Sequence, residues 1–359
     1  MNLETVTLLL KNFNIQAFQH DLVRWFDEEK RDLPWRQNKD PYRVWISEIM
    51  LQQTKVDTVI PYFERFIEKF PTLDRLAAAD EQEVLKAWEG LGYYSRARNL
   101  QHAVREVVST YNSKVPNNPE QLGTLKGVGP YTKGAILSIA YGLPEPAVDG
   151  NVMRVLARIL HIEEDISKQS VRRLVEECVK QIISEGKASE FNQGLMELGA
   201  LICTPKAPSC MHCPVQAHCR AYEAGTEKTL PIKAKAKKQK SLDYFSLVIK
   251  DNQDNYLIEK RPSEGLLANM WQFPMVSKSD ANATKLTEWF LENYGIKLVL
   301  KDTLTEIKHV FSHVIWHIDV LEAEVLDGEL KKELATFVPQ ATFAEYPFPV
   351  PHLKIQSYL

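Results

Sequence analysis

The sequence lacks several features that mark whole classes of protein. It contains no apolar stretch of membrane-spanning length, and residues 1–18 have neither a basic leader nor a cleavage-site pattern, so we expect a cytosolic protein without a membrane partner. The formal net charge of −3 over 359 residues excludes a uniformly basic nucleic-acid binder. Any contact with nucleic acid must therefore depend on local patches or on backbone amides.

Cysteine is scarce, and its distribution is uneven. Four of the five cysteines fall within residues 203–219, separated by six, two and five residues: Cys203, Cys210, Cys213 and Cys219. In a reducing compartment such a group favours metal ligation over disulfides. Four soft thiolates suit either zinc or an iron-sulfur cluster. Cys178 recurs at helical spacing with apolar residues, which predicts a place in the core.

The apolar periodicity changes once along the chain. Residues 15–203 show helical spacing, whereas the segments after residue 241 alternate as strands do, around one amphipathic helix at 284–294. Between them, residues 226–240 carry six lysines against one glutamate, which indicates a linker that is either a solvated tether or a phosphate-contacting strap. We predict a helical domain over 1–225, a linker over 226–240 and an α+β domain over 241–359.

The stretch "LKGVGPYTKG", residues 125–134, has glycines typical of a phosphate-binding loop. A nucleotide-binding loop of the Walker type needs Lys-Ser or Lys-Thr, but Lys133 is followed by Gly134. The pattern instead predicts a tight turn through Gly127 and Gly129 and a new helix that begins at Pro130. The free amides of that helix could face a DNA phosphate, or the turn could be a corner that binds nothing.

One carboxyl group is a candidate general acid, and a second precedes a helix that it could cap. In "PYRVWISEIMLQQTKV" the helical period places Glu48 among apolar neighbours, where burial raises a carboxyl pKa and keeps a proton available near neutrality. A glutamate at a helix edge is otherwise commonly exposed to solvent. Asp149 precedes the helical segment "VMRVLARIL", which either Asp149 or Asn151 could cap.

These motifs together resemble a known family. The cysteine spacing and residues 125–159 resemble the endonuclease III superfamily of helix-hairpin-helix DNA glycosylases, and this resemblance selects a 4Fe-4S cluster over zinc. The strings "LPWR" and "WISEIMLQQT" resemble the adenine DNA glycosylase (MutY) family more narrowly. The resemblance implies a multidomain protein with an all-α helix-hairpin-helix domain that contains the 4Fe-4S loop, followed by an α+β Nudix-like domain.

The resemblance also implies the roles of the catalytic residues. Glu48 would protonate the departing adenine, and Asp149, next to Asn151, would stabilise the positive charge that develops on the sugar. Superfamily members that cut the DNA strand have a lysine where this chain has Tyr131, and they use its amine to form a Schiff base. A tyrosine cannot form that imine, so we expect an enzyme that removes a base and leaves the strand intact.

Further residues would bind DNA by the same resemblance. Trp35 and Arg36 would help to form an adenine pocket, although a core tryptophan and a surface arginine are the ordinary alternatives. Gln53 and Tyr93 match residues that wedge into the duplex when the base is flipped. An aromatic residue after Leu-Gly is otherwise commonly a core residue.

Residues 241–359 resemble the Nudix-like domain of adenine glycosylases. The expected helix lacks the Arg-Glu and paired-Glu pattern of a metal-dependent hydrolase, so we expect recognition of a base without hydrolysis. The string "KHVFSHVIWHI" matches the loop that recognises 8-oxoguanine, with Phe311, Ser312 and His313 at its centre. A serine hydroxyl can donate to and accept from this lesion, although an ordinary hairpin turn would have a similar sequence.

The function predicted from the sequence is DNA base excision repair, in which adenine paired with 8-oxoguanine or guanine is removed from duplex DNA. The alternatives are a bifunctional glycosylase that also cleaves the strand and a non-catalytic, metal-containing DNA-binding protein. We expect a monomer in the bacterial cytoplasm, associated with the nucleoid when it acts.

Overall fold

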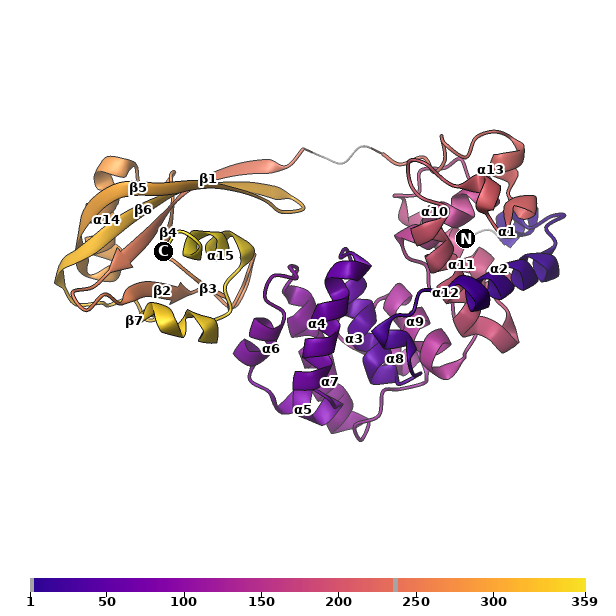
Figure 1. Ribbon diagram of the computed structural model, residues 1–359, viewed down its shortest axis with the longest axis horizontal. Coiled ribbons are helices and arrows are strands. Elements are labelled where there is room, and N and C mark those ends of the chain that lie inside the picture. Colours follow the sequence, from indigo (N-terminus) through magenta and orange to yellow (C-terminus); the bar gives the residue numbers. More distant parts are fainter. Residues whose placement is uncertain (1–2, 235–237) are drawn as a thin grey trace. The chain divides into compact units, whose positions relative to one another are not determined.

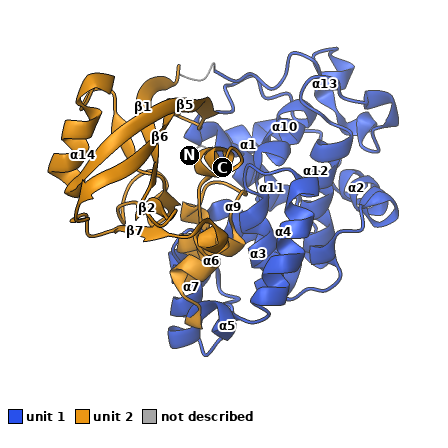
Figure 2. Ribbon diagram, turned by 60° about the vertical axis from the view of Figure 1, so that its left-hand side comes forward, with its two compact units in different colours: residues 1–77, 102–235 blue, residues 78–101, 236–359 orange. Residues whose placement is uncertain are grey.

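The computed structural model describes residues 3–234 and 238–359, which group into two compact units (Figure 2). Unit 1 comprises residues 1–77 and 102–235, and unit 2 comprises residues 78–101 and 236–359. The expected all-α part followed by an α+β part is confirmed. Nothing in the sequence pattern indicated that residues 78–101 group with the C-terminal residues.

Unit 1 is built from helices (Figure 1). Its elements are α1 Leu3–Leu9, α2 Ile15–Glu29, η1 Pro34–Arg36, α3 Pro41–Leu51, α4 Val56–Lys69, α5 Leu73–Ala78, the later part of α7 Ser95–Thr110, α8 Pro119–Thr124, α9 Pro130–Tyr141, α10 Gly150–Ile159, α11 Gln169–Ile182, η2 Glu185–Lys187, α12 Ala188–Leu201, η3 Cys210–His212, η4 Gln216–His218 and α13 Arg220–Glu223.

Side-chain caps and prolines fix where the helices of unit 1 begin. Asp40 accepts a hydrogen bond from the Tyr42 amide, directly before Pro41 at the first position of α3. Asn118 caps α8 in the same way, and Asp149 caps α10 through the Val152 amide. These caps set the register of α3 and α10, the two helices that carry the candidate carboxyl groups.

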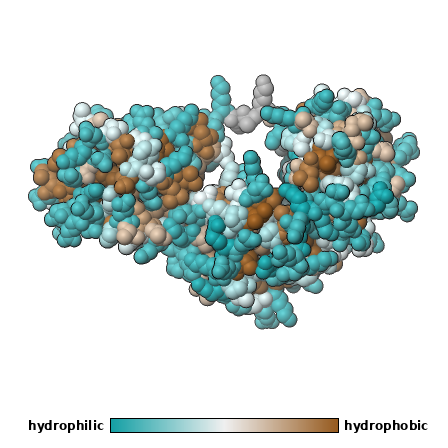
Figure 3. Space-filling view, viewed as in Figure 1, coloured by the Kyte–Doolittle hydropathy of each residue, from teal (hydrophilic) through white to brown (hydrophobic). Residues whose placement is uncertain are grey.

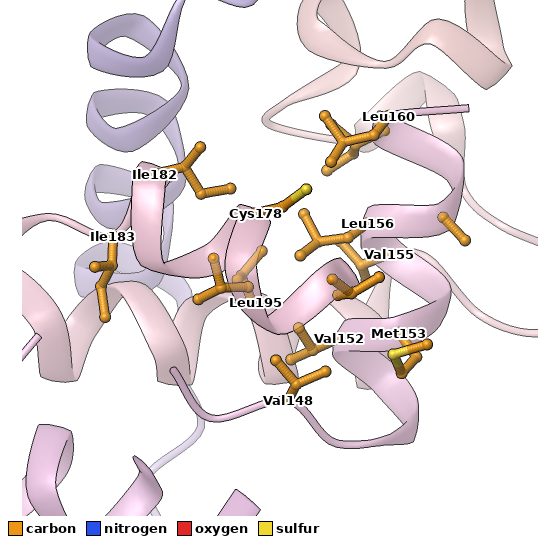
Figure 4. Close-up of a cluster of buried hydrophobic side chains, with 14 of the residues drawn as sticks. Val148, Val152, Met153, Val155, Leu156, Leu160, Cys178, Ile182, Ile183 and Leu195 are labelled. Carbon is orange, nitrogen blue, oxygen red and sulfur yellow. The ribbon is translucent and has the colours of Figure 1, made fainter. Parts of the chain in front are cut away.

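The core of unit 1 packs α10, α11 and α12 against α2. Cys178 of α11 is fully buried with Leu156 and Ile182, as its spacing predicted (Figure 4).

Two glycines allow other elements to approach the Asp149 turn. A Cβ atom at Gly134 would lie 1.8 Å from the Pro146 carbonyl oxygen, and one at Gly199 would lie 2.6 Å from the Asn151 Cβ. Neither position has room for a side chain.

Unit 2 is a mixed sheet with helices. Its elements are α6 Glu81–Ala87, the start of α7, β1 Lys240–Lys250, β2 Tyr256–Lys260, β3 Trp271–Gln272, β4 Met275–Ser277, η5 Ala283–Lys285, α14 Leu286–Tyr294, β5 Ile296–Val310, β6 Val314–Gly328, β7 Ala335–Val338, η6 Gln340–Glu345 and α15 Val350–Gln356. The strand order is β3-β2-β1-β6-β5, with β4 paired to β1 and β7 to β2. Strand β1 is parallel to β6, and β5 is antiparallel to β6.

Both faces of this sheet are buried. Along β1, Leu247 and Ile249 pack with Phe290 of α14, whereas Val248 belongs to the cluster that contains Phe348 and Ile355 beside α15. Successive side chains of a strand point to opposite faces of the sheet. Because both faces are covered, neighbouring residues of β1 are all buried, and its sequence is a continuous apolar run. Strands β5 and β6 meet at residues 311–313, as the sequence predicted.

The lysine-rich segment is partly ordered against unit 1. Leu230 is buried, and the Ile166 amide donates to the Ile232 carbonyl at 3.0 Å. The predicted linker also includes residues 235–237, which lie outside the described residues.

The face shown in Figure 3 is mostly hydrophilic, with scattered apolar patches. Within the described ranges, no helix combines the length and the apolar character that a membrane span requires.

Candidate active site

Glu48 lies in α3, and its carboxyl group is removed from water. The side chain is 5% exposed and accepts a hydrogen bond from the Tyr131 hydroxyl of α9. Burial raises the pKa of Glu48 to about 7; the Tyr131 hydrogen bond opposes this shift, and the charge of Asp149 adds to it. The expected buried, protonatable carboxyl group is therefore present, and a substantial fraction of it keeps its proton near neutrality.

Asp149 occupies the N-terminal cap of α10. One carboxyl oxygen accepts from the Val152 amide at 2.7 Å, and the other accepts from the Asn151 side-chain amide at 2.8 Å. Burial raises the pKa of Asp149, while these two hydrogen bonds act in the opposite direction. The Asn151 oxygen in turn accepts from Arg154 at 2.9 Å. Asp149 is thus a helix cap, and the two hydrogen bonds hold its carboxyl group in a defined orientation.

One cavity of about 680 Å³ in unit 1 brings most of the predicted residues together. The predicted residues that line it are Trp35, Arg36, Glu48, Gln53, Gly127, Gly129, Tyr131, Asp149 and Asn151. We call it the carboxylate cavity. No lysine is among the described residues that line it. The side chain of Lys133 lies beside Gly123 instead: a Cβ atom added to Gly123 would be 3.6 Å from the Cδ of Lys133.

An ion-pair network around the buried Glu197 forms one wall of the carboxylate cavity. Glu197 of α12 accepts two side-chain hydrogen bonds from Arg31, at 2.8 and 2.9 Å, and two from Arg36. Although burial opposes it, the hydrogen bonds from both arginines lower the pKa of Glu197 to about 2. Arg36 also donates to Gln193 at 3.1 Å. The Arg36 guanidinium is therefore held by protein groups, and Arg31 and Glu197 are site residues that the sequence analysis missed.

Trp35 lies in η1 and is 6% exposed. Its ring makes an edge contact with Phe63 at 5.5 Å between centroids, and it also lines the carboxylate cavity. Trp35 therefore packs in the core with one part of its ring and lines the cavity with another; its role in an adenine pocket stays a prediction.

The rim of the carboxylate cavity contains the glycine turn and Gln53. Gly127 has φ +82°, a conformation that favours glycine, whereas Gly129 is extended. No side chain caps the start of α9 after Gly129, so its first amides suit a phosphate. Gln53 is exposed and has φ +59°, a conformation that is uncommon for a residue with a side chain.

The four clustered cysteines line a second pocket of unit 1, beyond the end of α12. Burial raises the pKa of the Cys213 thiol to about 12, so thiolates here need a positive charge such as that of a metal. Arg158, which is 1% exposed, donates to the Cys203 sulfur at 3.1 Å. Among the described residues, no three His, Cys, Asp or Glu side chains converge as a single ion requires.

In unit 2 the β5–β6 turn faces the segment that follows α6. The Tyr93 hydroxyl and the Ser312 hydroxyl are 2.7 Å apart and form a hydrogen bond. Tyr93 is 43% exposed, which contradicts the alternative that it is a core residue. Phe311 packs its ring on His309 and on Trp316, at 4.4 and 4.8 Å between centroids.

Tyr93, Phe311, Ser312 and His313 line a pocket of about 490 Å³, which we call the turn pocket. Leu266 and Leu267 form another wall. The pocket therefore offers apolar surface for a flat ring together with two hydroxyl groups that can each donate and accept.

Sequence profiles of two families match the chain. The profile described as HhH-GPD superfamily base excision DNA repair protein matches residues 46–181, and the profile of the NUDIX domain matches residues 245–358. These matches agree with the helical part and the α+β part of the fold.

Curated proteins and solved structures resemble the chain. The adenine DNA glycosylase of Rattus norvegicus is 37% identical over 84% of this chain and 69% of its own length. The adenine DNA glycosylase of Buchnera aphidicola (strain Bp) is 34% identical over 84% of this chain and 85% of its own. A thermostable thymine-DNA glycosylase structure is 29% identical, with a TM-score of 0.53 over 60% of this chain and 99% of that one.

Proposed function

The chain belongs to the adenine DNA glycosylase family, and we propose that its substrate is adenine paired with 8-oxoguanine, or with guanine, in duplex DNA. The protein is an enzyme of base excision repair that hydrolyses an N-glycosidic bond. The observation that carries the proposed mechanism is the single cavity lined by a protonatable Glu48 and a capped Asp149.

In the proposed reaction, Glu48 donates its proton to N7 of the flipped adenine, so that the base leaves as a neutral molecule. The pKa of about 7 supports this role, because the group holds its proton at neutrality and can also release it. The Tyr131 hydroxyl donates to the same carboxyl group and orients it. Trp35 supplies apolar surface beside the base.

Asp149 supports the other half of the reaction. As the bond to adenine breaks, positive charge develops on the deoxyribose, and a carboxylate nearby lowers the energy of that state. The Val152 amide and the Asn151 amide hold the carboxylate in place before the reaction begins. The different environments of Glu48 and Asp149 support their division into acid and stabiliser.

We propose that the enzyme leaves the DNA strand intact. Strand cleavage by a lyase needs an amine that forms an imine with the opened sugar. Tyr131 occupies the position where the resemblance expects that lysine, and no lysine lines the described carboxylate cavity. The bifunctional alternative lacks its nucleophile there.

The turn pocket is the proposed site for the base opposite the adenine. An oxidised guanine has a donor at N7 and an acceptor at C8, and the Ser312 hydroxyl can satisfy both kinds of group.

The exposed Tyr93 and Gln53 are proposed to fill the space in the duplex that the flipped base leaves, which offsets part of the cost of unstacking.

The cysteine pocket is proposed to hold a 4Fe-4S cluster through Cys203, Cys210, Cys213 and Cys219. Cysteine thiolates that hold such a cluster persist in a reducing compartment, which supports a cytoplasmic location. One chain carries both the carboxylate cavity and the turn pocket, so we propose that the enzyme acts as a monomer.

The test is incubation of the enzyme with duplexes that pair adenine with 8-oxoguanine, guanine or thymine. We expect free adenine to appear fastest opposite 8-oxoguanine, and strand breaks to appear only after alkali. Strand breaks without alkali, together with lysine-dependent trapping by borohydride, would show a lyase instead. Absence of adenine release from every duplex would leave only DNA binding.

A further inference from the structure

We propose that Gln82 and Glu89 are positioning residues for discrimination of the base opposite the adenine, because they fix Tyr93 beside Ser312. Neither residue lines the turn pocket. The inference rests on the proposed recognition of 8-oxoguanine and adds to it the part of the chain that holds the recognising groups together.

Gln82 of α6 uses both ends of its amide to bind the β2–β3 loop and β3. Its nitrogen donates to the Asn269 carbonyl at 3.0 Å, and its oxygen accepts from the Trp271 indole N–H at 2.9 Å. The Asn269 side chain donates back to Glu81 at 2.6 Å. Asn269 has φ +62°, so its loop is held in an unusual conformation at the point of contact.

Glu89 provides a second anchor at the other end of α6. Its two oxygens accept from the Phe348 amide at 2.7 Å and from the Lys86 ammonium at 2.8 Å. Lys86 also donates to the Tyr346 carbonyl at 3.0 Å. A charged pair thus joins α6 to the segment before α15, and hydrogen bonds to charged groups are among the stronger ones.

The chain between Glu89 and Tyr93 is a short turn with unusual backbone conformations. Gly90, Gly92 and Tyr93 all have positive φ, at 91°, 75° and 49°. Arg96 donates to the Gly92 carbonyl at 3.0 Å, and its guanidinium lies 5.3 Å from the Tyr93 ring centroid. A shift of Glu89 therefore moves the Tyr93 hydroxyl.

The same anchors also contact the loop that supplies another wall of the turn pocket. The loop that contains Asn269 also supplies Leu266 and Leu267 to that pocket. Arg98, after Tyr93, donates to the Ser263 carbonyl at 3.3 Å in the same loop. Residues 78–101 are thus hydrogen-bonded to the loop that forms a wall of the turn pocket. Discrimination of the base depends on the relative positions of Tyr93 and Ser312, because a hydrogen bond weakens steeply when its distance or angle departs from the preferred range.

The experiment compares single-turnover rates of adenine release opposite 8-oxoguanine and opposite guanine. For Gln82→Ala we expect the preference for 8-oxoguanine to fall about tenfold, as the loss of one or two hydrogen bonds allows, with the rate opposite guanine unchanged. Gln253→Ala, the same substitution at an exposed turn of the C-terminal domain, should keep the full preference. Glu89→Ala should behave like Gln82→Ala, and Glu89→Gln should recover part of the loss because it can still accept from Phe348.

A double-mutant cycle tests the bond itself. Trp271→Phe removes the indole donor and keeps an aromatic ring, so it should lower the preference as Gln82→Ala does, and the double variant should lose little more. It also replaces Gln82→Ala if that variant fails to fold. An unchanged preference in folded variants at both anchors would overturn the inference, as would an equal loss opposite both bases. A wild-type enzyme without any preference would refute the proposed recognition of 8-oxoguanine itself.

Discussion

The carboxylate cavity of unit 1 and the turn pocket of unit 2 solve different physical problems. In the first, Glu48 is 5% exposed, and burial itself raises its pKa. In the second, Ser312 is exposed and Tyr93 is 43% exposed. Acid catalysis requires a group that keeps its proton near neutrality, whereas contact with a base requires accessible groups that can donate and accept hydrogen bonds.

The two sites also differ in how the chain assembles them. The carboxylate cavity lies between helices of one packed core, and its carboxyl groups are oriented by hydrogen bonds from neighbouring residues. The turn pocket joins Tyr93 and Ser312, which are 219 residues apart. Substitutions in the first site should therefore change the chemical step, and those in the second should change the choice of partner base.

The largest effect is expected for Glu48→Gln. The amide keeps the shape and can still accept from the Tyr131 hydroxyl, but it cannot donate a carboxyl proton. Adenine release should fall by about 10²–10⁴-fold, the range of general acid catalysis, while binding to the duplex in a gel-shift assay persists. Retained adenine release would remove Glu48 as the acid.

Asp149→Asn should have the next largest effect. Asparagine also caps helices well, so α10 and the thermal unfolding midpoint should be preserved. Loss of the charge should slow single-turnover adenine release by about 10²–10³-fold, as loss of an electrostatic stabiliser does. A normal rate in this variant would mean that Asp149 serves only as a helix cap.

The pH dependence should follow Glu48. Its pKa is raised to about 7, so the protonated form dominates below that pH and decreases about tenfold with each pH unit above it. A pH profile of the single-turnover rate should therefore fall on the alkaline side as Glu48 loses its proton, and it should also fall on the acidic side where Asp149, whose pKa is raised by burial, gains one. A flat profile through neutrality would contradict the role of Glu48.

The smallest effect is expected in the turn pocket. Ser312→Ala removes one hydroxyl, so the preference for 8-oxoguanine over guanine should narrow by about tenfold or less, the scale of one hydrogen bond. The rate opposite guanine should be little changed. Ser241→Ala, at an exposed position of β1, is the matched control. An unchanged preference would place recognition of the lesion elsewhere.

The sequence predicted best what local physics determines. The helical period gave the burial of Glu48, and the position of Asp149 before an apolar helix gave its cap. The turn at Ser312 followed from strand alternation on either side. Each of these features depends on residues within a few positions, so the pattern carries the information.

The features that the sequence did not reveal depend on distant partners. Glu197 finds Arg31 and Arg36, which are 166 and 161 residues away, and no local pattern marks an exposed-looking glutamate for burial. The grouping of residues 78–101 with the C-terminal residues depends on similarly distant bonds. The positive φ of Gln53 and Tyr93 was not predictable, because side chains seldom adopt it.

The glycines on either side of the Asp149 turn have a consequence for inherited variation. Gly134 faces the Pro146 carbonyl and Gly199 faces Asn151, each too closely for one extra methyl group. A change to alanine at either position would displace the turn while every reacting group stayed chemically intact. Such alleles would be scored as repair-deficient, yet a screen that inspected only the groups touching DNA would pass over them.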